Sequence, residues 1–81
     1  MRLDTLPRGQ TALIAAVDWD CLAPAESRRL RELGFDEGVA VETLHNGPFG
    51  RDPIACRVGR MIVAIRRVHA AAISVETLAK A

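Results

Sequence analysis

Hydrophobic and polar positions alternate along the chain in short segments, which is typical of a β-rich domain. An apolar run over 10–17 follows a Pro-Arg-Gly turn and predicts a first strand. Period-two alternation over 39–44 predicts a second strand that ends at His45-Asn46-Gly47. Residues 48–53 hold two prolines and a glycine, so we expect a surface loop there.

One segment has the composition and pattern of an amphipathic helix. Residues 24–33 are rich in Ala, Glu, Arg and Leu, and the opening proline suits the first helical position. Leu30 and Leu33 share one face at i, i+3 spacing. Gly34 follows where a left-handed residue is needed, and Phe35 then stands where it can contact Leu30. The sequence therefore predicts a Schellman-type helix end.

The second half of the chain contains a hairpin signal. The apolar runs 54–58 and 61–66 flank Gly59-Arg60, a two-residue connection with glycine first, as a type II′ turn requires. Pairing Val58 with Met61 places six apolar side chains on one face, namely Ile54, Cys56, Val58, Met61, Val63 and Ile65. We expect a helical turn over 68–72 and a short closing strand over 73–75.

Five short strands with one inserted helix predict a small, mostly antiparallel β-barrel. A doubly wound sheet is excluded because its parallel strands each need a crossover of a dozen or more residues. We expect one domain over residues 1–76, followed by a short C-terminal tail over 77–81.

Composition limits the classes of partner. The chain has 81 residues, 49% of them hydrophobic, and 11 basic against 10 acidic residues give a net charge of +1. This balance does not favour a phosphate backbone or an anionic membrane as partner. The N-terminus lacks the apolar core of a signal peptide, and no apolar stretch approaches the roughly 18 residues that span a bilayer. We therefore expect a soluble, cytoplasmic protein.

The residues that could carry chemistry show no catalytic or ligand spacing. None of the hydroxyl residues lies in a nucleophile-elbow sequence, and no glycine-rich phosphate loop is present. Cys21 and Cys56 are 35 positions apart, so we expect reduced, partly buried thiols, with Cys56 structural. Together with His45 and His69 they lack metal-ligand spacing. We therefore predict no enzymatic activity, no cofactor and no metal site.

Arginines and two aromatic residues leave alternatives open. A basic face resembling that of an RNA-binding barrel could form from Arg28, Arg29, Arg31, Arg57, Arg60, Arg66 and Arg67. The scarcity of aromatic stacking platforms argues against this alternative. Trp19 and Phe49 each suit either a lid over the barrel or an exposed partner anchor.

Several motifs occur in a characteristic order: LDTLPRG at 3–9, RLRELGF at 29–35 with Gly38 and Val41, PFG at 48–50, DPI at 52–54, and VAIRR at 63–67 before Ala70 and Ile73. Together they resemble the FeoA family of bacterial ferrous-iron uptake. The resemblance implies an SH3-like barrel. It also implies an accessory role beside FeoB, the membrane permease with a cytosolic G-protein domain.

From this resemblance we expect the chain to bind the cytosolic part of FeoB and to modulate its activity. Exposure is the reason for expecting the contact surface on the helix and on the 47–53 loop. The candidate partner-binding residues are Arg28, Arg31, Pro48, Phe49 and Asp52. The alternatives are a metal-responsive regulatory module and a small RNA-binding barrel.

Overall fold

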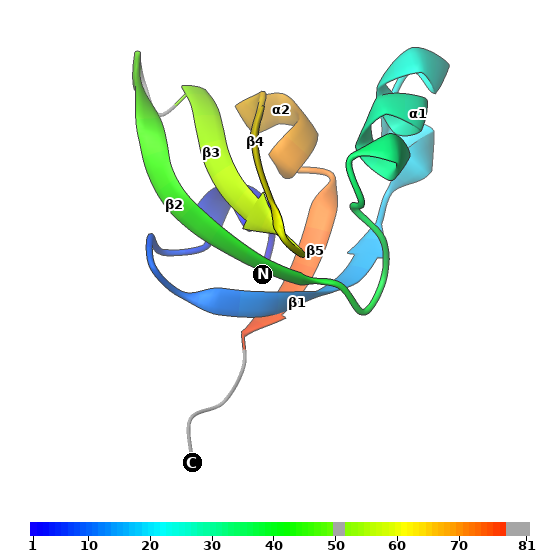
Figure 1. The fold of residues 1–81 in the computed structure, drawn as a ribbon. Coiled ribbons are helices and arrows are strands. Elements are labelled where there is room, and N and C mark those ends of the chain that lie inside the picture. The colour runs from blue at the N-terminus through cyan, green and yellow to red at the C-terminus, as the bar shows by residue number, and fades with distance from the viewer. Residues whose placement is uncertain (50–51, 78–81) are drawn as a thin grey trace.

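A single curved antiparallel sheet with helices at one end forms the domain (Figure 1). The computed structural model describes residues 1–49 and 52–77, and for 45–49 the backbone alone. The elements are η1 (Leu3–Thr5), β1 (Thr11–Val17), η2 (Trp19–Cys21), α1 (Pro24–Glu32), β2 (Ala40–Phe49), β3 (Asp52–Val58), β4 (Met61–Ile65), α2 (Arg67–Ala70) and β5 (Ile73–Thr77). The strand order is β4-β3-β2-β1-β5, so β4 and β5 are the edge strands.

Most elements expected from the sequence are present. Strand β1 and helix α1 agree with the predictions to within one residue, and α2 and β5 occupy the place of the helical turn and closing strand. The β3–β4 register is confirmed, with Val58 opposite Met61 and Ile54 opposite Ile65. Gly59 has a φ of 57°, which the first position of this turn demands and which a side chain would oppose.

The loop expected over 48–53 is wrong at its two ends, 48–49 and 52–53, while residues 50–51 lie outside the described part of the structure. Strand β2 continues past the predicted end to Phe49, and β3 begins at Asp52, with Phe49 opposite Asp52. The two prolines are tolerated because each stands where a strand has pairing on one side only. Strand β1 pairs with β2 only over 40–42, and β4 pairs with β3 only from Ile54 onward.

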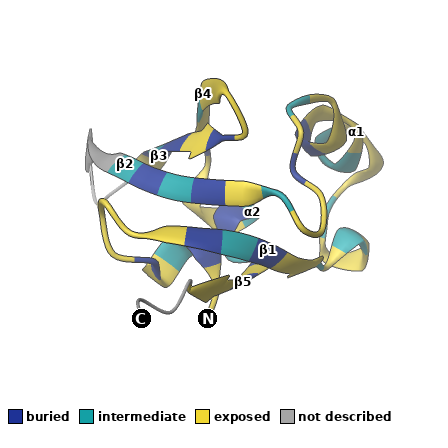
Figure 2. Cartoon of the chain, turned by 60° about the horizontal axis from the view of Figure 1, so that its bottom comes forward, coloured by how far each residue is buried: buried dark blue, intermediate teal, exposed yellow. Residues whose placement is uncertain are grey.

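The core lies on the concave face of the sheet. Buried and half-buried residues alternate along the middle of β1 and along 41–44 of β2 in Figure 2, as expected for strands with one face covered. The buried apolar residues are Leu3, Leu6, Ala12, Ile14, Leu30, Phe35, Val41, Ile54, Cys56, Val58, Ile65, Ala70, Ile73 and Val75. Met61 shares the predicted apolar face of the hairpin but is 49% exposed, whereas Val58 opposite it is buried.

Helix α1 ends in the predicted Schellman motif. The Phe35 amide donates to the Leu30 carbonyl at 3.0 Å, and the Gly34 amide donates to the Arg31 carbonyl at 3.1 Å. Gly34 has a φ of 99°, which closes the motif. Leu30 is 1% exposed and Phe35 is fully buried. This junction therefore fixes α1 against the core and directs the chain into β2.

Candidate protein-binding surface

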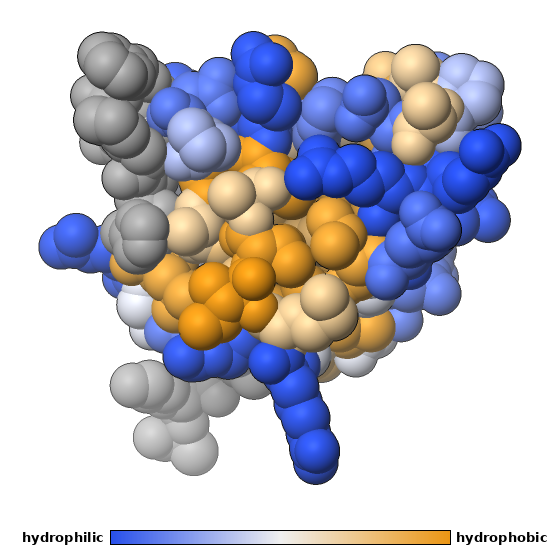
Figure 3. All heavy atoms as spheres, turned by 45° about the horizontal axis from the view of Figure 1, so that its top comes forward, coloured by the Kyte–Doolittle hydropathy of each residue, from blue (hydrophilic) through white to orange (hydrophobic). Residues whose placement is uncertain are grey.

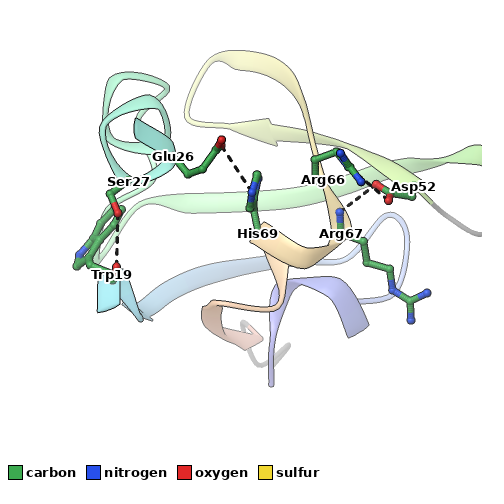
Figure 4. A network of polar contacts seen from close by, with 7 residues as sticks. All are labelled: Trp19, Glu26, Ser27, Asp52, Arg66, Arg67 and His69. Atoms are coloured by element: carbon green, nitrogen blue, oxygen red, sulfur yellow. Dashed lines mark hydrogen bonds and ion pairs between the residues drawn. The ribbon is translucent and has the colours of Figure 1, made fainter. Parts of the chain in front are cut away.

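Trp19 and Arg31 connect η2 to helix α1. The Arg31 guanidinium lies 4.4 Å from the centre of the Trp19 ring, within the range of a cation–π interaction. The Ser27 hydroxyl lies 3.5 Å from the Trp19 carbonyl oxygen, which it can reach as a donor (Figure 4). Trp19 is half-buried and packs against the core. It therefore covers one end of the domain, in agreement with the lid interpretation.

Arg28 and Arg31, both predicted contact residues, lie in different environments. Both are exposed residues of α1. Arg31 stacks on Trp19, whereas Arg28 has no ion pair or ring contact within the described residues. Arg28 is therefore the more available of the two for an acidic partner group.

Asp52, a third predicted contact residue, is occupied within the chain. Its Oδ1 accepts a hydrogen bond from the Arg67 amide at 3.1 Å, and its Oδ2 lies 3.6 Å from the Arg66 Nε (Figure 4). Arg67 is the first residue of α2, where amides lack partners within the helix. Asp52 therefore joins the start of β3 to the start of α2.

Replacing Asp52 by alanine is expected to lower the free energy of unfolding by about 1 kcal/mol, the usual effect of losing a side-chain acceptor at a helix start. Urea denaturation followed by far-UV circular dichroism would measure this change. Asp52→Asn is the matched control, because it keeps a hydrogen-bond acceptor and loses only the charge. It should lower the free energy of unfolding by less than Asp52→Ala does. An Asp52→Ala protein as stable as the parent would contradict this role.

Pro48 and Phe49 lie at the end of β2, and their side chains fall outside the described part of the structure. Figure 1 places this end of the β2–β3 hairpin and helix α1 on opposite sides of α2 and β4. The predicted residues therefore do not form one continuous surface. Arg28 and Arg31 belong to one region, and Pro48, Phe49 and Asp52 to another.

An apolar surface that the sequence analysis did not identify lies between these two regions. Hydrophobic residues gather at the centre of the face in Figure 3 and are framed by hydrophilic side chains. The exposed large apolar residues of β4 are Met61 (49%) and Ile62 (64%), which point to opposite faces of this edge strand. Val68 on α2 is also exposed (65%), but it lines a separate pocket with Arg2 and Ser74. The predicted hairpin register contained the signal for Ile62, because it paired Ile62 with Arg57 on the outward face.

The basic face of the RNA-binding alternative is partly neutralised. Arg57 pairs with Glu42 at 3.2 Å, and Arg66 pairs with Asp52 at 3.6 Å. Arg31 is engaged by the Trp19 ring. These interactions reduce the charge and the aromatic surface that a nucleic acid would need.

The two cysteines are free thiols in different surroundings. Cys56 is fully buried, as predicted, and desolvation raises the pKa of its thiol to about 11. Cys21 is exposed, contrary to the expected partial burial, and its thiol donates to Asp18 Oδ2 at 2.8 Å. That hydrogen bond and the charge of Asp18 raise the pKa of Cys21. Both surroundings disfavour the thiolate that nucleophilic or metal chemistry needs.

His69 connects the two helices. Its Nε2 lies 3.6 Å from Glu26 Oε2, so α2 contacts α1 through this pair (Figure 4). The side chain of His45 lies outside the described residues. Within the described residues, no three His, Cys, Asp or Glu side chains come together as a metal-binding group.

A pocket of about 370 Å³ lies between η1 and strands β2 and β3. Its polar lining includes Asp4 and Thr43, and Asp4 Oδ1 lies 3.6 Å from the Arg2 Nε. Across residues 1–49 and 52–77, no helix has the length and apolar character needed to cross a bilayer.

Comparison with known proteins identifies the family. The FeoA domain model matches residues 1–77. The FeoA protein of Chlorobium tepidum is 35% identical with a TM-score of 0.85, and the match covers 98% of this chain and 71% of that one. The Stenotrophomonas maltophilia FeoA, solved with zinc, is 38% identical with a TM-score of 0.79, covering 94% and 89% of the two chains. That protein is described as a prokaryotic SH3 domain protein and a candidate activating factor of ferrous iron transport.

A manganese-dependent transcriptional repressor shares the fold alone, at 20% identity and a TM-score of 0.83 over 96% of this chain and 41% of that one. A search of curated proteins returns no significant match. The five-stranded antiparallel sheet with one main helix is thus the SH3-like fold seen in FeoA structures. The chain belongs to the FeoA family, which is associated with ferrous iron transport.

Proposed function

We propose that this chain is a cytoplasmic accessory protein of ferrous-iron uptake that binds the cytosolic part of the FeoB permease and modulates its transport. The FeoA domain match over residues 1–77 carries the proposal. The description of the Stenotrophomonas relative as a candidate transport-activating factor agrees with it.

The chemistry of the described residues supports binding rather than catalysis or iron carriage. Both cysteines have pKa values raised above the ordinary range, and no metal-binding cluster is present in the described part. In contrast, Met61, Ile62 and Val68 expose large apolar side chains. Exposed apolar surface with a polar rim is typical of protein–protein contact.

The contact surface that we propose joins this apolar region to the exposed helix. Arg28 contributes a charge without a partner among the described residues, and the edge strand β4 contributes the apolar side chains of Met61 and Ile62. Arg31, Pro48, Phe49 and Asp52 remain within the proposal as flanking positions. Substitution of Arg31 or Asp52 would also disturb contacts within the chain, so Arg28 is the cleaner test of binding.

Co-purification with full-length FeoB in detergent, with and without guanine nucleotide, tests the proposal. We expect retention by the parent protein and at least about tenfold weaker binding by Arg28→Glu, if the charge is buried in the complex. Arg8→Glu is the matched control, because Arg8 is exposed in the turn before β1, on the other side of the molecule from α1 in Figure 1. Absence of association in both nucleotide conditions would refute the proposal.

A further inference from the structure

The outer edge of β4 has unpaired backbone groups. Within the described residues β4 pairs with β3 alone, and no other element follows it in the sheet. Val58 and Met61 close a two-residue turn, so Met61, Val63 and Ile65 direct their amides and carbonyls toward β3. The Gly59 amide donates to the Ala40 carbonyl of β2, which fixes the same alternation.

The alternation leaves Ile62 and Ala64 with backbone amides and carbonyls on the free edge. The side chains of both residues are exposed, and that of Ile62 is 64% exposed. Ala64 has no bulk to obstruct an approaching strand. The edge therefore offers two backbone amide donors and two carbonyl acceptors for hydrogen bonds, next to the apolar side chain of Ile62.

The devices that usually protect an edge strand are absent from β4. Its sequence is MIVAI, without proline, lysine or an inward charge, and its register with β3 has no bulge. Charge occurs only at its two ends, where Arg60 lies in the turn before the strand and Arg66 follows it. The Arg66 side chain is 65% exposed although its Nε lies 3.6 Å from Asp52 Oδ2, so a partner carboxylate can still reach it. Arg66 has an extended backbone (φ −68°, ψ 144°), so it continues the line of the strand.

These flanking arginines discriminate between possible occupants. Two copies of β4 could pair in antiparallel fashion through the outward backbone groups of Ile62 and Ala64. Ile62 of one copy would then stand opposite Ala64 of the other. In that register the turn residue Arg60 of each copy comes close to Arg66 of the other. Like charges directly opposite each other destabilise a strand pair. A strand with acidic residues at the same two places would instead be stabilised.

We propose that the free edge of β4 binds an extended segment of a partner protein by β-strand addition, and that Arg60 and Arg66 select a segment with acidic residues at its two ends. The inference rests on the proposed function, since it takes the partner to be a protein, and it specifies how that partner is held. Main-chain hydrogen bonds to Ile62 and Ala64 provide affinity, while the apolar positions and flanking charges provide specificity.

Amide hydrogen exchange of the full ¹⁵N-labelled chain, measured by NMR with a synthetic peptide, tests the inference. The probe is Glu-Val-Thr-Val-Thr-Val-Glu, whose two glutamates are six positions apart, as Arg60 and Arg66 are, and its control carries lysine at both ends. We expect saturable binding and slower exchange at the Ile62 and Ala64 amides, with little change at Met61, Val63 and Ile65. The lysine peptide should bind at least about tenfold more weakly. Absence of binding, or protection elsewhere, would overturn the inference.

Ala64→Pro provides a second test. It removes an amide that the β3 ladder does not use, so the fold should persist, which urea unfolding would verify. We expect loss of peptide binding and at least about tenfold weaker retention of full-length FeoB. Ala64→Thr, which keeps the amide, is the matched control.

The two proposals fail in different ways. If FeoB binds the Ala64→Pro protein as well as the parent, the strand-addition inference is wrong and the proposed function stands. If the peptide protects Ile62 and Ala64 while FeoB is not retained, the edge is a binding site and the proposed function is wrong. Should Ala64→Pro not fold, the exchange experiment on the parent chain decides the inference alone.

Discussion

Phe35→Ala is expected to lower the free energy of unfolding by about 3–5 kcal/mol, the usual cost of truncating a buried aromatic side chain. Phe35 is fully buried and stands at the junction between α1 and β2. Its backbone amide also closes the end of α1 through the Leu30 carbonyl. Truncation thus leaves a cavity where the helix is attached to the core. A chain of this size has only about 4–12 kcal/mol of stability, so the variant will be marginal.

Urea unfolding followed by fluorescence would measure this loss, because Trp19 is the single tryptophan and packs against the same core. Phe35→Leu is the matched control, since it keeps most of the apolar volume and should cost no more than about 1.5 kcal/mol. Leu33→Ala truncates a half-buried neighbouring side chain, so it should lower the free energy of unfolding by less than Phe35→Ala does. A loss below about 1 kcal/mol for Phe35→Ala would contradict the role assigned to this junction.

The parts of the fold that the sequence predicted correctly are determined by local interactions. The end of α1 depends on Gly34 and Phe35, which lie within six residues of the groups that they contact. The β3–β4 register follows from the two-residue turn at Gly59-Arg60. In both cases a glycine supplies a positive φ that other residues rarely adopt, and an apolar pattern lies directly beside it. A few neighbouring residues are therefore enough to predict the structure.

The errors arose where long-range contacts decide the outcome. Pro48 and Pro53 lie within strands because their open sides have no neighbour, which depends on where β1 and β4 stop pairing. The contact between Asp52 and the Arg67 amide, fifteen residues away, was likewise not predicted. Trp19 and Arg31 meet across the segment that connects η2 to α1. None of these contacts has a periodic signature in the sequence.

The candidate site shows the same division. Exposure of the α1 arginines was predictable from an amphipathic pattern, and the structure confirms that Arg28 and Arg31 are exposed. The apolar edge at Ile62 was predictable in principle, because the register that buries Cys56 and partly buries Val63 turns Ile62 outward. A hydrophobic side chain on the solvent-facing side of a correctly predicted strand is therefore as informative about function as a charged side chain on a helix.

Alkaline pH is expected to destabilise the domain through Cys56. Burial raises the pKa of this thiol from 9.0 to about 11 in the folded chain. The folded pKa is the higher one, so stability is unaffected below about pH 8, where the thiol is neutral in both states. As the pH rises from about 9 to about 11, only the unfolded chain releases the proton. The free energy of unfolding should fall by roughly 2–3 kcal/mol over this window.

Urea unfolding at a series of pH values would measure this decline. The chain contains no tyrosine and its only lysine is Lys80, so few other groups titrate in the window. A Cys21→Ser background removes the second thiol, whose pKa is also raised. In that background, adding Cys56→Ala should lower stability at pH 7 and flatten its dependence between pH 9 and 11. An equally steep decline without Cys56 would show that another group is responsible.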